Sequence, residues 1–216
     1  MAITYVNTIG TVGVMGGVST LPTPFVKCLV DFVTYNNEYL LKDNEQIFYN
    51  FANMSYHSMA RNYLAEHTRG KWILMLDTDQ TFDPDILVRI KYLADQHDIG
   101  VLTGLYRQKA EPYRPVIYKE VDGKLEQIIE WDRDLFPIDS AGGGCLFIRY
   151  QVLRELFNKT KLPFAEIEGM SEDHSFFKRV RDLGIQPYCA ADVKINHLFW
   201  GGVTEELYKN GKADRS

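Results

Sequence analysis

Apolar runs alternate with segments of helical spacing through the first half of the chain. Runs typical of strands buried on both faces fall at residues 11–15, 71–76 and 99–102, with a weaker one at 47–49. Helices are predicted between them: one opened by Pro22 and Pro24, one over residues 59–67, and one with Asp83 as N-cap and Pro84 at its first position. This alternation, up to about residue 105, predicts a mostly parallel sheet of βα units flanked by helices.

The second half of the chain has a different pattern. Residues 116–118 and 125–131 are expected to pair as a hairpin, because Asp122-Gly123 between them is a typical two-residue turn. Further strands are expected at residues 145–148, 188–190 and 193–196, and helices at residues 152–157 and 172–183. We therefore predict an α/β protein with a small antiparallel extension. It would form one domain over residues 1–216, with a first half to about residue 106 and a second half over residues 107–216.

Composition and charge narrow the class of protein. Of the 216 residues, 45% are hydrophobic and 25% are charged, which is typical of a globular domain with a substantial core. The formal net charge of -5 provides no general attraction to nucleic acid or to an anionic membrane. No run approaches the roughly 18 apolar residues of a membrane helix, and the N-terminus lacks a signal-peptide pattern. We expect a cytoplasmic protein with no membrane partner, whose Cys28, Cys145 and Cys189 are reduced core thiols.

The triplet Asp77-Thr78-Asp79 follows the most apolar strand of the chain. In an open α/β sheet, ligands bind beyond the carboxyl ends of the strands. If the strand continues through the triplet, both carboxylates share a face and suit Mg²⁺ or Mn²⁺, and through the ion a diphosphate. The alternative is an Asx-type turn that caps the next helix. A calcium loop of the EF-hand type is excluded, because Phe82 and Val88 stand where it needs glycine and glutamate.

Four further polar residues are candidates for chemistry. Glu172 and Asp173 open a helix, where they either stabilise its N-terminus or present a general base to the crevice. His197 follows the last predicted strand and is either an ordinary packed histidine or a further ligand of an ion held by carboxylate. Arg61 lies on the polar face of a predicted helix and by itself indicates no more than that.

The order of these signals along the chain resembles that of the GT-A-type nucleotide-sugar glycosyltransferases, close to the family 2-like group. The resemblance spans roughly residues 10–200. It rests on the motifs Ala60-Arg61-Asn62, Asp77-Thr78-Asp79, Phe82-Asp83-Pro84-Asp85, Gly104-Leu105-Tyr106, the Gly-rich residues 141–148, Glu172-Asp173 and His197. There are two departures. No second acidic motif follows the second strand, and His174 stands where relatives often have an apolar residue.

The resemblance implies a GT-A fold and metal-dependent transfer of a sugar from a nucleoside diphosphate sugar, with UDP as the expected nucleotide. Asp79 and His197 would bind Mn²⁺ or Mg²⁺, and Asp77 would contact the ion, its waters or the ribose. Asp173, with Glu172 as second candidate, would deprotonate the acceptor hydroxyl. The residues expected to hold the donor are Val14, Gly16, Val18, Arg61, Asp77, Thr78 and Asp79.

Several alternatives remain open from the sequence. The acceptor is a modified DNA base, a glycan or a protein hydroxyl, and the small relatives with a G-L-Y segment resemble phage and bacterial proteins, which would place a phage-encoded enzyme in the host cytoplasm. A nucleotidyltransferase is the nearest other enzyme, although residues 13–20 lack its usual Arg and Lys. A non-catalytic sugar-nucleotide-binding module is the non-enzyme alternative. Trp131, Tyr106 and Trp200 are either stacking platforms for a sugar or base, or core aromatic residues.

Overall fold

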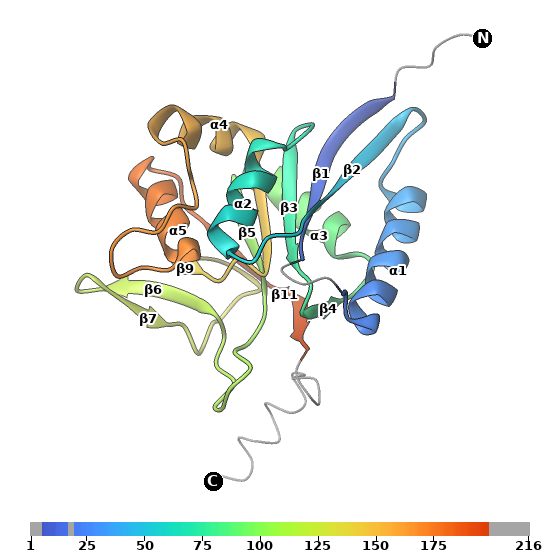
Figure 1. The fold of residues 1–216 in the computed structure, drawn as a ribbon. Helices are drawn as coiled ribbons and strands as arrows, with labels where there is room; N and C mark the ends of the chain where they lie inside the picture. The colour runs from blue at the N-terminus through green and yellow to red at the C-terminus, as the bar shows by residue number, and fades with distance from the viewer. Residues whose placement is uncertain (1–5, 17–19, 199–216) are drawn as a thin grey trace.

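The computed structural model describes residues 6–16 and 20–198, which form a central sheet with helices on both faces (Figure 1). The sheet follows the order β2, β1, β3, β10, β5, β11, β4, and β8 pairs with β11. Its strands are β1 (Asn7–Met15), β2 (Glu45–Ala52), β3 (Trp72–Asp77), β4 (Gln80–Phe82), β5 (Val101–Leu105), β8 (Leu135–Pro137), β10 (Cys145–Arg149) and β11 (Tyr188–His197). The predicted strands are therefore present, with the two late ones joined as β11.

Most strands of this sheet share one direction, as the sequence predicts. Strands β1, β2, β3, β5 and β11 share one direction, whereas β10, β4 and β8 run against it. Strand β10 is inserted at the centre, antiparallel to both β3 and β5. The carboxyl ends of β1, β2 and β3 consequently meet at one edge, where an α/β sheet binds its ligands.

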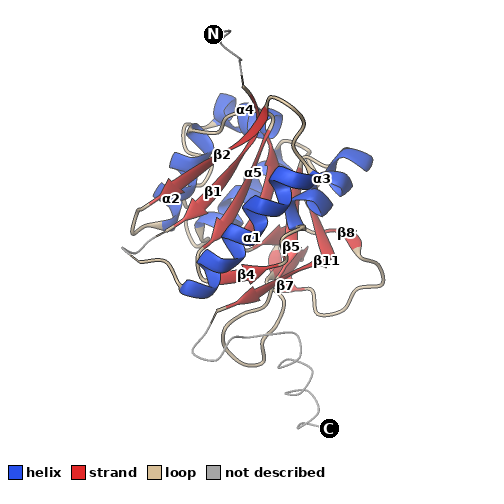
Figure 2. Cartoon of the chain, turned by 90° about the vertical axis from the view of Figure 1, so that its right-hand side faces the viewer, coloured by secondary structure: helices blue, strands red, loops and turns tan. Residues whose placement is uncertain are grey.

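The helices bury two separate faces of the sheet. Figure 2 shows α1 (Thr23–Tyr39) and α3 (Ile86–Gln96) in front of the strands. Figure 1 places α2 (His57–Glu66), α4 (Tyr150–Lys159) and α5 (Glu172–Asp182) on the other side. The apolar run of β3 serves both faces, because Leu74 and Leu76 pack with α1 and α3 while Ile73 and Met75 pack with α2, α4 and α5. No helix in the described residues is long and apolar enough to cross a membrane.

A small antiparallel sheet adjoins α5. It contains β6 (Ile117–Val121), β7 (Lys124–Gln127) and β9 (Ser140–Ala141) in the order β7, β6, β9. The predicted hairpin is confirmed: Asp122 and Gly123 both have positive φ, of 49° and 74°, as a tight turn between twisted strands requires. This sheet is the antiparallel extension expected from the second half of the chain.

The segment after the Asp triplet differs from the prediction. Residues Gln80–Phe82 form the short strand β4, paired with β11, and α3 begins only at Ile86 with Asp85 at its N-cap. The prediction that Asp83 caps this helix and Pro84 opens it is therefore wrong. Pairing with β11 keeps the chain extended through Phe82, so the helix starts later than its local sequence suggests. The Asx-cap interpretation of the triplet also fails, because a strand follows it.

Candidate active site

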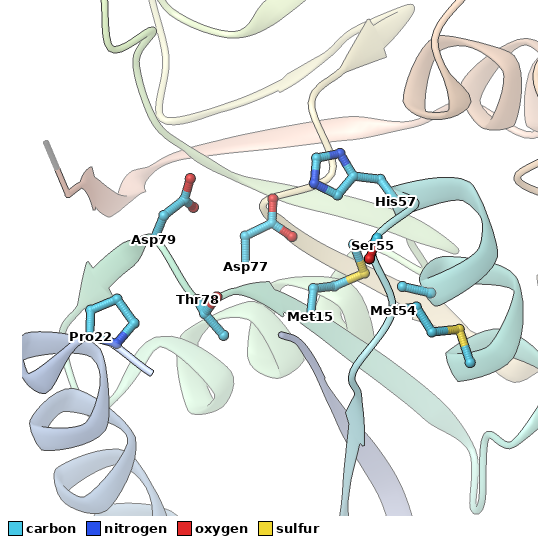
Figure 3. Close-up of a pocket in the computed structure, with 9 residues that line it drawn as sticks. Met15, Pro22, Met54, Ser55, His57, Asp77, Thr78 and Asp79 are labelled. Atoms are coloured by element: carbon cyan, nitrogen blue, oxygen red, sulfur yellow. The ribbon is translucent and has the colours of Figure 1, made fainter. Parts of the chain in front are cut away.

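A cavity of about 340 Å³ lies at the carboxyl ends of β1, β2 and β3. Figure 3 shows Asp77, Thr78 and Asp79 along it, with Pro22 on one side and Met54, Ser55 and His57 on the other. Met15, the last residue of β1, and Ala60 of α2 complete the lining. The triplet therefore lies along a cavity at the end of β3, but the strand does not continue through it: β3 ends at Asp77, and Thr78 and Asp79 form a turn, so the condition for two carboxylates on one strand face is not met.

The two carboxylates of the triplet have different partners. Strand β3 ends at Asp77, whose backbone N–H donates to the carbonyl oxygen of Gly144 at 3.0 Å. The Asp77 side chain accepts from Nη2 of Arg61, at 3.3 Å to each oxygen. The Asp79 side chain instead pairs with the ammonium group of Lys109. The triplet therefore joins two separate charge clusters, one around Arg61 and one around Asp79.

Arg61 links the triplet to the helix that carries Glu172 and Asp173. Only 2% of its side chain is exposed, and its Nη1 donates to the carbonyl oxygen of Gly143 at 2.9 Å. Its Nε lies 3.0 Å from Asp173 Oδ1 and 3.6 Å from Glu172 Oε1. One buried cation thus faces three carboxylates, which brings residues separated by about half the chain into one cluster.

Burial and charge together shift the pKa values of this cluster. Burial disfavours the charged form of Arg61, but the carboxylates of Asp173, Asp77 and Glu172 outweigh it and raise its pKa. Burial raises the pKa of Asp173, Arg61 opposes the rise, and the neighbouring charge of Glu172 adds to it. Burial likewise raises the pKa of Asp77 against the effect of Arg61. A carboxylate with a raised pKa accepts a proton more readily, which suits a general base.

The Gly-rich run before β10 passes through the Arg61 cluster. A Cβ atom on Gly143 would lie 2.5 Å from both Arg61 Cζ and Asp173 Oδ1. Side chains on Gly142 and Gly144 would overlap Tyr106 Oη and Gln80 Nε2. The glycines therefore allow a close approach to buried side chains of the protein itself.

The Asp79 cluster contains the predicted histidine. His197 Nδ1 lies 2.5 Å from the carbonyl oxygen of Arg107, and since a carbonyl only accepts, Nδ1 must carry the proton. Burial lowers the pKa of His197, so the ring is neutral at pH 7 and Nε2 carries a lone pair. Nε2 lies 4.0 Å from Asp79 Oδ1, which is buried and has no hydrogen-bond partner.

These two atoms fit a divalent ion. The fit is one of donor chemistry, because a carboxylate oxygen and a neutral imidazole nitrogen are both ligands that divalent ions take. Across residues 6–16 and 20–198, no group of three or more His, Cys, Asp or Glu side chains is arranged to hold a metal ion. Asp77, the third predicted ligand, is directed to Arg61.

The other predicted site residues lie in different surroundings. The Val14 side chain is fully buried in the core with those of α1 and α3, while Gly16 donates its N–H to the carbonyl oxygen of Ala52. Val18 and Trp200 lie outside the described residues. Tyr106 is buried beneath His197, so the core interpretation holds for it.

Three site residues were missed by the sequence analysis. Lys109 comes from the segment between β5 and β6, and no periodic pattern marks it. Gln80 was hidden in the unrecognised β4; its amide is fully buried with no hydrogen-bond partner. His57, at the start of α2, borders the cavity and lies 3.9 Å from Glu172. Trp131, predicted as a platform or core residue, stacks on Phe136 with ring centroids 5.9 Å apart.

Comparisons with known proteins agree with this architecture. Among solved structures, A197 from STIV is 18% identical, with a TM-score of 0.62 over 88% of this chain and 85% of that one. The inositol-1-phosphate CTP transferase from T. maritima is 10% identical, with a TM-score of 0.52 over 96% of each chain. At these identities the likeness shows the fold alone. No curated protein matches the sequence.

A family model gives the assignment. The model described as glycosyl transferase family 2 matches residues 33–157, which is more than half of the chain and includes both Arg61 and the Asp triplet. The match confirms the family and the GT-A fold expected from the motifs. The chain belongs to glycosyl transferase family 2.

Proposed function

We propose that this protein transfers a sugar from a nucleoside diphosphate sugar, with UDP as the expected nucleotide, to a hydroxyl group of an acceptor. The observation that supports this most is the Arg61 cluster. It places Asp173, a candidate base with a raised pKa, beside the strand end that carries Asp77 and the cavity. Donor binding and proton removal would then occur on two sides of one buried cation.

The chemistry follows from these positions. The acceptor oxygen attacks the anomeric carbon, the bond from that carbon to the diphosphate breaks, and the electron pair goes to the departing phosphate oxygen. The acceptor proton passes to the carboxylate of Asp173, with Glu172 as the second candidate. Attack opposite the diphosphate inverts the anomeric centre.

Asp79 and His197 would hold Mn²⁺ or Mg²⁺ through Oδ1 and Nε2. The ion would act as a Lewis acid toward the charge that builds on the diphosphate. Asp77 would serve the nucleotide side from its place on the cavity. A hydroxyl of a modified DNA base or of a glycan is the proposed acceptor.

The first test measures binding and turnover in one series. Nucleotide sugars are screened by thermal shift with and without Mn²⁺, and any stabilising donor is then tested for hydrolysis. Asp173→Asn should keep the donor affinity within about threefold while turnover falls by roughly 10²–10⁴, the usual contribution of a general base. Normal turnover of the variant would remove Asp173 as the base.

The same series separates the alternative functions. A nucleotidyltransferase would release pyrophosphate from a nucleoside triphosphate and a sugar phosphate, and without added pyrophosphate would leave nucleotide sugars uncleaved. A non-catalytic binding module would be stabilised by a nucleotide sugar but would neither hydrolyse nor transfer it.

A further inference from the structure

Lys109 occupies one oxygen of Asp79. It lies in the segment between β5 and β6, and its ammonium group donates to Asp79 Oδ2. Both side chains are partly open to solvent, with 39% of Lys109 and 43% of Asp79 exposed. An ion pair of this exposure contributes little to folding stability. The placement of Lys109 therefore calls for a reason other than stability.

The segment that carries Lys109 has a defined shape. Gln108 N–H donates to the carbonyl oxygen of Arg114 and Tyr113 N–H to that of Ala110, each at 2.9 Å. The carbonyl oxygen of Arg107 accepts from His197. One short segment thus fixes the histidine toward Oδ1 of Asp79 and supplies the lysine that holds Oδ2.

The two carboxylate oxygens of Asp79 therefore have different surroundings. Oδ1 is buried without a hydrogen-bond partner and faces His197, so an ion can bind there while Lys109 remains on Oδ2. An ion at Oδ1 and an ammonium group at Oδ2 would stand side by side at the cavity edge. Two adjacent cations form a site for an anion with two charged groups.

Lys109 adds a positive charge beside Asp79, while the other carboxylate of the cavity lining, Asp77, is paired with Arg61. A divalent ion bound to the single charge of Asp79 leaves one positive charge, whereas the diphosphate of a nucleotide sugar carries two negative charges. Lys109 supplies the second positive charge. No lysine or arginine is among the described residues that line the cavity. Lys109 reaches its edge through Asp79, which does line it, whereas Arg61 is buried against three carboxylates.

We propose that Lys109 binds the diphosphate of the donor, at the phosphate that departs with the electron pair of the broken sugar–oxygen bond. Before the donor arrives, Lys109 holds Asp79 with Oδ1 toward His197. When the donor is bound, the ammonium group donates to the terminal phosphate of the leaving diphosphate and stabilises its added charge. This inference rests on the proposed function, because it takes a nucleoside diphosphate as the ligand.

The test compares two nucleotides that differ only in the terminal phosphate. Binding of UDP and of UMP is measured by calorimetry, each with Mn²⁺, for the wild type and Lys109→Ala. We expect the variant to bind UDP about ten- to a hundredfold more weakly, the range of a hydrogen bond to a charged group, and UMP within about threefold of the wild type. Lys91→Ala is the matched control, since Lys91 also pairs with an exposed aspartate, Asp95, but on the outer face of α3.

Affinity for Mn²⁺ alone separates a direct role from an indirect one. If Lys109 binds the phosphate, Lys109→Ala should bind Mn²⁺ as well as or better than the wild type, because a competing cation has left Asp79. A parallel loss of affinity for Mn²⁺, UMP and UDP would overturn the inference, since Lys109 would then act only by placing Asp79. Unchanged UDP affinity would overturn it as well.

The outcome also distinguishes this inference from the proposed function. A wild-type protein that binds neither UDP nor another nucleoside diphosphate in the presence of Mn²⁺ contradicts both. Wild-type binding together with an unaltered Lys109→Ala variant contradicts the role of Lys109 alone. Thermal unfolding of each variant provides the check on folding, and for this exposed pair we expect no more than a small shift.

Discussion

Arg61 is the residue at which the two sides of the site meet. Its guanidinium group contacts Asp77 at the end of β3 and Asp173 at the start of α5, and it donates to the Gly143 carbonyl between them. Only 2% of the Arg61 side chain is exposed, and it is not among the described residues that line the cavity. Arg61 is therefore best described as a positioning residue that sets the distance between the donor side and the candidate base.

Loss of Arg61 should destabilise the fold strongly. Arg61→Ala would leave carboxylates buried without their cation, which typically costs about 3–5 kcal/mol of unfolding free energy. Arg89→Ala is the matched control, because Arg89 also pairs with two aspartates, Asp85 and Asp192, but is more exposed. For the control we expect about 1 kcal/mol or less. Urea denaturation measures the unfolding free energy of both variants. Equal losses would show that the burial of Arg61 makes no additional contribution to stability.

The pH dependence of transfer tests the origin of the raised pKa of Asp173. Burial is its largest cause, and the charge of Glu172 adds to it. A base must be ionised, so activity falls as the pH drops through the pKa of Asp173. Glu172→Gln removes one cause of the rise and lowers that pKa, which should move the acid limb of kcat/KM to lower pH. Asp182→Asn, at the far end of α5, is the control and should leave the limb in place.

The candidate site residues that the sequence indicates are those marked by a local motif. Asp77, Asp79 and Asp173 each follow a strand or open a helix, and such positions can be read from neighbouring residues. Lys109 reaches Asp79 from 30 positions away through an irregular segment. No local pattern records that contact, because it is created by the tertiary structure.

At the scale of elements, β4 shows where local patterns fail. Gln80–Phe82 has no alternation that marks a strand, and Asp83-Pro84 after it is a common helix opening. The segment is extended because β11, more than a hundred residues later, provides hydrogen-bond partners for it. Strands with long apolar runs, such as β3, were predictable because burial on both faces leaves a signal in the sequence itself.

The turn into β10 should not tolerate a side chain at Gly143. Gly143→Ala would place a Cβ atom 2.5 Å from Arg61 and Asp173, so the cluster must shift or the turn must open. We expect a loss of about 1–3 kcal/mol in unfolding free energy, the usual range for overpacking, together with a sharp loss of transfer activity. Gly16→Ala serves as the stability control, since its nearest neighbour would be 3.7 Å away.

The strand order belongs to the whole molecule and could not be predicted from the pattern. The run Cys145–Ile148 indicates a strand buried on both faces. An apolar run does not show whether the strand is parallel or antiparallel to its neighbours. Its antiparallel insertion between β3 and β5 brings the Gly-rich turn next to Asp77, whose N–H donates to Gly144. This insertion places the Arg61 cluster at the carboxyl edge of the sheet.

Ligand binding at this edge should stabilise the whole fold, and the metal part of that gain should depend on Asp79. The proposed site joins the turn between β3 and β4 to the end of β11 through Asp79 and His197, which lie far apart in the sequence. At a ligand concentration of about 100 times Kd, binding adds roughly 2.7 kcal/mol, which corresponds to a rise in Tm of about 5–10 °C for a domain of this size. UDP with Mn²⁺ should therefore raise the Tm of the wild type more than UDP alone.

Asp79→Ala should abolish the part of that rise that Mn²⁺ adds, while any gain from UDP alone remains. Asp95→Ala, which removes an exposed carboxylate from α3, should retain the full increment. The comparison depends on the difference between the two ligand conditions, so a change in the Tm of the unliganded variant does not affect it. If Asp79→Ala retains the Mn²⁺ increment, the ion binds elsewhere, and the orphaned Oδ1 facing His197 is not its ligand.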